Sequence, residues 1–141
     1  MFISIFKSIL AIVVGLVLIS LIVEPIEFAV VTILNGSVTT DPLVYFQIRN
    51  QMPVLLLKMI YNTLGAMVGG FVTALIAGKR EVLHGIVLAI VQTIALIGGM
   101  LTPPYGELTP MPVWIALIAF TFPAIVFGAW FRQSRMSSKR G

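Results

Sequence analysis

The chain has 141 residues, of which 59% are hydrophobic and only 10% are charged. Soluble domains carry about 25% charged residues, so this chain has too few polar groups to cover a water-facing surface. The absence of cysteine excludes disulfide frameworks and thiolate metal sites. The net charge of +4 comes from basic residues at the ends of apolar blocks. Retention of these residues in the cytoplasm explains their positions better than nucleic-acid binding does. The long apolar blocks predict a single membrane domain (1–141) built of spans of roughly 20 residues each.

The first predicted span covers residues 2–23. A basic residue followed by an apolar run resembles a signal peptide, but bulky residues stand where a signal peptidase requires small ones. The segment is therefore expected to remain as an uncleaved anchor. Glu24 and Pro25 are expected to end this span, because proline donates no helix hydrogen bond and clashes with the preceding turn.

An outer loop is predicted over residues 24–52. Its apolar stretch 28–34 is too short to cross a membrane and is expected to lie at the membrane surface. Asp41 is a favourable N-cap and Pro42 a favourable first helical residue. The loop is therefore predicted to contain a short surface helix that runs from Pro42 to about Asn50.

Three further spans are predicted at 53–77, 82–101 and 113–131, followed by a basic cytoplasmic tail at 132–141. The tight connection 78–81 (Gly-Lys-Arg-Glu) joins the second and third spans as an antiparallel hairpin. The predicted fold class is therefore all-α. We expect a polytopic membrane protein with four transmembrane helices in an antiparallel bundle and a short helix on the outer surface.

The orientation of the bundle follows from its lysines and arginines. With both termini and the 78–81 turn on one side, that side holds Lys7, Lys79, Arg80, Arg132, Arg135, Lys139 and Arg140. The other side holds only Arg49 and Lys58. Because basic residues are retained in the cytoplasm, both termini are predicted to be cytoplasmic. Trp114 and Trp130, which are roughly 24 Å apart along the fourth span, are expected to lie one at each membrane interface.

The second span carries two adjoining rows of small residues, because residues four apart share one face of a helix. The rows are Gly65, Gly69, Thr73, Ala77 and Ala66, Gly70, Ala74, Gly78. Small residues let helix backbones approach closely in lipid, so Gly65, Gly69, Gly70, Ala74 and Gly78 are predicted to form a helix-packing surface. Small residues in the first and third spans indicate that these two spans pack on it. The alternative is that the thin face leaves room for a lipid or a small solute.

Lys58 and Asn62 continue the second row toward the outer side, and Gln92 lies in the third span. These three residues form a candidate polar site. Lys58 has two structural interpretations, an ion pair with Glu24 or Glu27 and a side chain extended to the headgroups, and one functional interpretation, a solute-binding role. An axial offset of roughly 7 Å argues against a direct hydrogen bond between Asn62 and Gln92.

Lys79, Arg80 and His84 form a candidate cytoplasmic contact for lipid headgroups. A lone histidine without a second histidine or a cysteine makes a poor metal site, so no metal or cofactor is predicted. Every acidic residue maps to a span end or a loop, and the chain shows no Ser-His-Asp or paired-carboxylate arrangement. The sequence therefore gives no indication of an enzyme.

One group of motifs carries a family resemblance: a proline-started second span, a GxxxGG segment, a basic turn and a histidine opening the third span. The residues are Pro53, Gly65, Gly69, Gly70, Lys79, Arg80 and His84. This pattern resembles that of uncharacterised bacterial inner-membrane proteins of four spans. The resemblance implies a bacterial inner-membrane location and four helices, and it implies no activity.

Two classes of function remain in view. The first is a structural, accessory or lipid-interacting membrane module, with membrane lipids, a second copy or another membrane protein as partners and no nucleic acid. The second is a small-solute transporter or channel subunit working as an oligomer, in which Lys58, Asn62 and Gln92 line a wet cavity. A lipid-acting enzyme would rest only on Lys79, Arg80 and His84. A water-accessible pocket holding Lys58 and Asn62 would favour transport, and a filled interior would argue against it.

Overall fold

The computed structural model describes residues 2–103 and 105–137, and the side chains of residues 5–103 and 106–136. The regular structure in this part of the chain consists of the helices α1 (Phe2–Asn35), α2 (Pro42–Arg49), α3 (Met52–Ala77), α4 (Glu81–Leu101), α5 (Tyr105–Leu108) and α6 (Met111–Ser137). Four of them, α1, α3, α4 and α6, are long and apolar enough to cross a membrane. The predicted all-α bundle with four membrane-spanning helices is confirmed.

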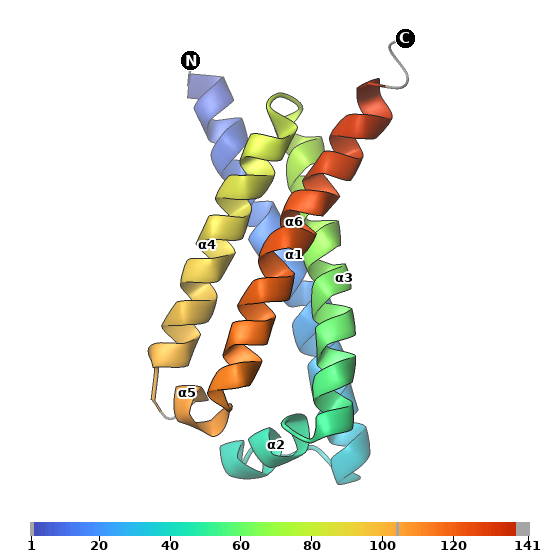
Figure 1. The fold of residues 1–141 in the computed structure, drawn as a ribbon, viewed down its shortest axis with the longest axis vertical. Coiled ribbons are helices and arrows are strands. Elements are labelled where there is room, and N and C mark those ends of the chain that lie inside the picture. The colour runs from blue at the N-terminus through green and yellow to red at the C-terminus, as the bar shows by residue number, and fades with distance from the viewer. Residues whose placement is uncertain (1, 104, 138–141) are drawn as a thin grey trace.

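The four long helices alternate in direction (Figure 1). One end of the bundle, which we call the turn end, holds the start of α1, the end of α6 and the α3–α4 connection. The opposite end, which we call the α2 end, holds α2 and α5. α3 is the central element, because it packs extensively on both α6 and α1 and to a lesser degree on α4. α1 and α4 make few contacts with each other, and Figure 1 shows them diverging toward the α2 end.

The predicted end of the first span at Glu24 and Pro25 is wrong. α1 continues through Pro25 to Asn35, so the stretch 28–34 belongs to this helix and not to a separate surface segment. A proline removes one helix hydrogen bond, but one face of the helix beyond it packs on the bundle, with Glu27 5% and Val31 1% exposed. The helix ends at Gly36, whose φ of +75° is a left-handed conformation that glycine adopts readily.

α2 begins as the sequence predicts. Asp41 is its N-cap, and the side chain of Asp41 accepts a hydrogen bond of 2.9 Å from the backbone amide of Leu43. At the other end of α2, the Asn50 side chain donates a hydrogen bond of 2.6 Å to the carbonyl of Leu108. This bond fastens α2 to α5 across the α2 end of the bundle.

One row of small residues on α3 faces α1. Gly65 and Gly69 lie against α1, and a Cβ atom on Gly69 would collide with the side chain of Ile19. Farther along the row, Thr73 donates a hydrogen bond of 3.1 Å to the backbone carbonyl of Ala11 in α1, although threonines in helices commonly bond to their own backbone. The predicted packing of the first span on this surface is therefore present.

The adjoining row faces α6, a partner that the sequence did not predict, while the predicted third span, α4, contacts α3 to a lesser degree. A Cβ atom on Gly70 would collide with the carbonyl of Ile125, and one on Gly128 would collide with the backbone of α3. Gly85, one of the small residues of α4, lies against Ala129 of α6. The small residues of α4 therefore contribute mainly to the contact with α6. α3 and α6 approach so closely that neither has room for a side chain at these glycines.

The turn end contains two residues with left-handed backbone conformations. Gly78, predicted as part of the packing surface, instead ends α3 with a φ of +67°, and its amide donates a hydrogen bond of 3.0 Å to the carbonyl of Ala74. Arg80 precedes α4 with a φ of +49°. The sequence predicted the last span to end at 131, but α6 continues to Ser137 and so includes part of the predicted basic tail. Residues 138–141 of that tail lie outside the described residues.

Candidate ligand-binding cavity

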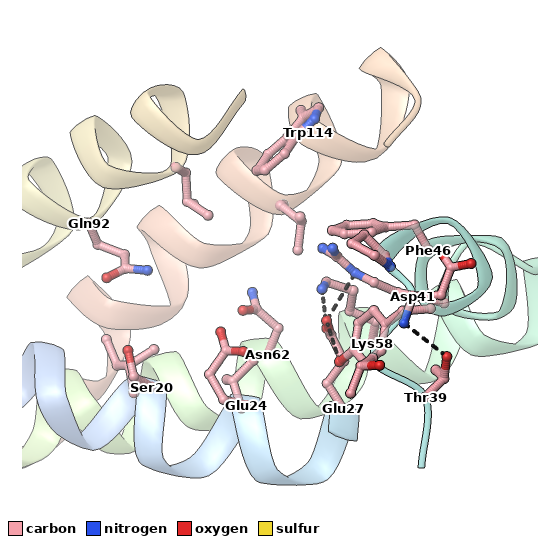
Figure 2. Close-up of a pocket in the computed structure, with 18 residues that line it drawn as sticks. Ser20, Glu24, Glu27, Thr39, Asp41, Phe46, Lys58, Asn62, Gln92 and Trp114 are labelled. Atoms are coloured by element: carbon pink, nitrogen blue, oxygen red, sulfur yellow. Dashed lines mark hydrogen bonds and ion pairs between the residues drawn. The ribbon is translucent and has the colours of Figure 1, made fainter. Parts of the chain in front are cut away.

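Glu27 is the centre of a buried polar cluster at the α2 end. Its carboxylate forms an ion pair and hydrogen bond with Lys58 Nζ of α3, and it lies 3.0 Å from Arg49 Nε of α2. Tyr61 and Tyr45 donate hydrogen bonds to the same carboxylate at 3.1 and 3.4 Å. We call these five residues the Glu27 cluster. Figure 2 shows the carboxylate between the helices that supply them.

Three features of the chain bring the cluster together. The continuation of α1 beyond Pro25 carries Glu27 into the bundle, where it is only 5% exposed. The start of α2 at Asp41 and Pro42 places Arg49 in the last turn of that helix. Lys58 lies near the α2 end of α3 on the face that packs into the bundle.

Two buried cations share one carboxylate in this cluster. Lys58 is 5% exposed and Arg49 is 8% exposed. Arg49 also stacks over the ring of Phe46, with 4.7 Å between its guanidinium carbon and the ring centroid. Although Arg49 Nε is within ion-pair distance of Glu27, it makes no hydrogen bond among the described residues. The cluster therefore has an excess of positive charge whose hydrogen-bonding capacity is not fully used.

Tyr45 is held as a neutral hydrogen-bond donor. Burial raises the pKa of its hydroxyl to about 12, and the negative charge of the Glu27 carboxylate adds to this effect. Both influences disfavour the phenolate. Tyr45 thus stabilises the Glu27 carboxylate without contributing a charge of its own.

A cavity of about 490 Å³ opens beside the Glu27 cluster. The residues that line it come from the four long helices and from the segment 39–49, which includes α2. Lys58, Asn62 and Gln92, which the sequence singled out as a candidate polar site, all line it. In Figure 2, Asn62 of α3 and Gln92 of α4 project into the same space. Asn62 donates a hydrogen bond of 2.7 Å to the hydroxyl of Thr121, in keeping with the predicted offset from Gln92.

The cavity lies where α1 and α4 diverge. At the turn end the two helices meet, since His84 Nε2 is 2.9 Å from the hydroxyl of Ser8 and the Leu88 side chain packs against Gly15. Toward the α2 end, α1 lines the cavity with Ile19, Ser20, Val23, Glu24 and Glu27, and α4 lines it with Gln92 and Leu96. The divergence of two spanning helices therefore creates the cavity, and α2 lies over its end.

Trp114 lies on the α6 side of the cavity and is only 7% exposed. Its indole nitrogen donates a hydrogen bond of 3.4 Å to the carbonyl of Gly106. The sequence predicted a tryptophan at the membrane interface here, which stays a prediction, and the ring faces the interior of the bundle. Trp130, at the other end of α6, is 52% exposed. The two tryptophans therefore lie in different environments, one beside the cavity and one on the outer face of the bundle.

Lys79 and Arg80 line a second cavity, of about 450 Å³, at the turn end, together with Arg132 of α6. His84 is not among the residues that line it. Its two ring nitrogens lie within hydrogen-bond distance of Ser8 and of the Arg80 carbonyl, at 2.9 and 3.0 Å. The His84 ring thus contacts the Arg80 backbone but does not line the cavity that holds Lys79 and Arg80.

Sequence reasoning named Glu27 only as a possible partner of Lys58, and it missed Arg49 as a site residue. The predicted ion pair between Lys58 and Glu27 is confirmed. The predicted end of the first span left Glu27 in a loop, and Arg49 belonged to a helix expected on the surface. The helical spacing of Glu24 and Glu27, three residues apart, was the available signal, because residues three apart lie on neighbouring positions of one helix face.

The described residues include no group of three or more histidines, cysteines, aspartates or glutamates that could hold a metal ion. Comparison with protein-family models, with curated proteins and with solved structures finds no match to this chain. The resemblance to four-span bacterial membrane proteins therefore stays a prediction. The function has to be argued from the geometry of the cavity.

Proposed function

We propose that this protein is a non-enzymatic, multi-pass protein of the bacterial inner membrane that binds a small polar ligand in the cavity at the α2 end, as part of solute binding or transport. The observation that carries the proposal is the position of Lys58, Asn62 and Gln92 on one cavity together with the buried charges of Glu27 and Arg49. Ionisable side chains inside membrane bundles are costly and commonly mark ligand or ion pathways.

A purely structural role for the cluster explains less. The ion pair between Lys58 and Glu27 would stabilise contact between α1 and α3 in either case. This ion pair is buried and also lines a cavity of about 490 Å³, a space that a purely structural pair would not require. Gln92 supports the same conclusion, because its side chain makes no hydrogen bond to any described residue and yet lines the cavity. Ligand binding accounts for both features.

The proposed orientation puts the turn end in the cytoplasm and the cavity on the outer side. The described basic residues support it, since Lys7, Lys79, Arg80, Arg132 and Arg135 belong to the segments at the turn end. In this orientation Lys79 and Arg80 lie where the headgroups of cytoplasmic anionic lipids are found. The ligand of the cavity would then enter from the outer side.

Cysteine labelling tests whether the cavity is wet and open to the outer side. The chain has no cysteine, so each variant carries a single thiol. Gln92→Cys should react with a membrane-impermeant thiol reagent added outside right-side-out vesicles. Ile94→Cys is the matched control, because Ile94 lies two residues away on α4 but is 63% exposed on the lipid-facing surface. It should react far more slowly, since thiolates form poorly in lipid. Equal, slow labelling of both variants would contradict the proposal.

A further inference from the structure

Charged residues that line the cavity lie at two levels along α1. Arg49 and Lys58 lie at the level of Glu27, and Glu24 lies one turn nearer the middle of the bundle. We propose that the cavity takes a small zwitterion, with its acidic group against Arg49 and Lys58 and its ammonium group against Glu24. This inference rests on the proposed function and names the ligand class. The shared chemistry is a short chain that joins an ammonium to a phosphate or carboxylate.

The binding site for the acidic group is the Glu27 cluster. Arg49 and Lys58 are both more than nine-tenths buried, and Glu27 is the single carboxylate that pairs with them among the described residues. Removing two cations from water and pairing them with one anion leaves an uncompensated charge, which is unfavourable. A ligand anion would compensate this charge. The guanidinium fork suits a carboxylate or a phosphate, and Arg49 Nε is buried without a hydrogen bond.

The binding site for the ammonium group is Glu24. It lies three residues before Glu27 on α1, which places it roughly 4.5 Å closer to the middle of the bundle along the helix axis. It lines the cavity, its residue is exposed, and its carboxylate makes no ion pair or hydrogen bond within the described side chains. Figure 2 shows Glu24 on the side of the cavity that also holds Asn62. The carboxylate lies close enough to interact electrostatically with Lys58, but no described side chain forms an ion pair or hydrogen bond with it, so it is available to a ligand cation.

The spacing of the two sites restricts the ligand. The two sites are offset along α1 by roughly 4.5 Å, the axial rise from Glu24 to Glu27, and an offset of this size suits an acidic and an amino group joined by a short aliphatic chain. Trp114, Leu117 and Leu96 form an apolar wall that suits such a chain. A free solute and the headgroup of a zwitterionic lipid both carry this chemistry. The test therefore includes both sources.

Fluorescence of Trp114 provides a local readout. The chain has two tryptophans, and Trp130→Phe leaves Trp114 as the one beside the cavity. Detergent-solubilised Trp130→Phe protein is titrated with phosphoethanolamine, with ethanolamine and with inorganic phosphate. We expect phosphoethanolamine to bind at least about tenfold more tightly than either half, because it alone engages both charged sites.

A second variant isolates the ammonium site. Glu24→Gln in the Trp130→Phe background should weaken phosphoethanolamine binding by about tenfold and leave phosphate binding unchanged. Phosphate affinity therefore serves as the internal control for an intact Glu27 cluster. Because Glu24 is exposed and makes no ion pair with the described side chains, this substitution should not impair folding.

The lipid arm repeats the titration in nanodiscs. If a lipid headgroup occupies the site, the response to phosphoethanolamine is lost in phosphatidylethanolamine nanodiscs and kept in phosphatidylglycerol nanodiscs; a free solute as ligand gives a response in both. Three results would overturn the proposal of a zwitterionic ligand. They are equal affinity for phosphate and phosphoethanolamine, an unchanged phosphoethanolamine affinity in Glu24→Gln, and no response to any probe. If Gln92→Cys is still labelled in that case, the proposed function survives; if Gln92→Cys is not labelled, both fail.

Discussion

Glu27 shows how one side chain can organise three helices. Its carboxylate receives Lys58 and Tyr61 from α3 and Tyr45 and Arg49 from α2, while its own backbone belongs to α1. A buried ion pair gains little over a well-packed apolar pair, but removing one partner leaves an unpaired buried charge. The cluster therefore depends strongly on its one carboxylate.

Glu27→Gln should lower the free energy of unfolding by about 3–5 kcal/mol, because it leaves two buried cations without an anion. The measurement is thermal or denaturant unfolding in detergent. Glu24→Gln is the matched control, since it makes the same chemical change one turn away on an exposed side chain. It should unfold close to the wild type. Indistinguishable stabilities of the two variants would show that the cluster contributes nothing to the fold.

At the scale of the helices, stability depends on close backbone contacts. The two rows on α3 are divided between α1 and α6, and Gly70 and Gly128 bring the backbones of α3 and α6 together. Lipid provides no hydrophobic drive between helices, so such contacts have to come from van der Waals packing. The consequence is that single methyl groups at these positions are not tolerated.

Gly70→Ala should destabilise the bundle by about 1–3 kcal/mol, because its methyl group would meet the carbonyl of Ile125. Gly98→Ala on α4 is the matched control, since a Cβ atom there would meet no atom of another described element within 4 Å. It should be neutral, or more stable by up to about 1 kcal/mol from helix propensity. Unfolding in detergent compares the two. A Gly70→Ala protein as stable as Gly98→Ala would refute the close α3–α6 contact.

The sequence predicts these elements well where local chemistry decides them. Asp41 and Pro42 were sufficient to place the start of α2, and the apolar blocks were sufficient to place the long helices. The end of α1 depends on tertiary contacts, because burial of Val31 and the pairing of Glu27 outweigh the local penalty of Pro25. The partner of the Gly70 row was also unpredictable, since a row of small residues shows that a contact exists and not which helix makes it.

At the scale of the whole molecule, the candidate site is a product of helix arrangement. Lys58 and Asn62 come from α3 and Gln92 from α4, and they line one cavity because α1 diverges from α4. The sequence could name these polar residues from their depth in a span. It could not predict the cavity, because helix crossing angles depend on contacts such as that between His84 and Ser8.

The proposed topology predicts the behaviour of fusions at Gly141. A reporter that is active only in the cytoplasm should be active there, and one that is active only in the periplasm should be inactive, because the basic residues of the turn end are retained in the cytoplasm. A matched fusion within the 36–41 connection should give the opposite pattern, since that segment lies at the α2 end. Activity of the periplasmic reporter at Gly141 would reverse the assigned sides.

The unequal support of α4 has a mechanical consequence. Its first two turns are held on two sides, by Ser8 and Gly15 of α1 and by Ala129 of α6. Beyond Leu88 the side of α4 that faces α1 borders the cavity. The part of α4 from Leu88 to Leu101, roughly 20 Å long, is therefore held on its α6 side, where Leu96 and Met100 pack against Trp114 and Leu117. A rotation of α4 by about 5° about Leu88 would move Leu101 by roughly 2 Å. Small rotations of this helix would therefore change the width of the cavity.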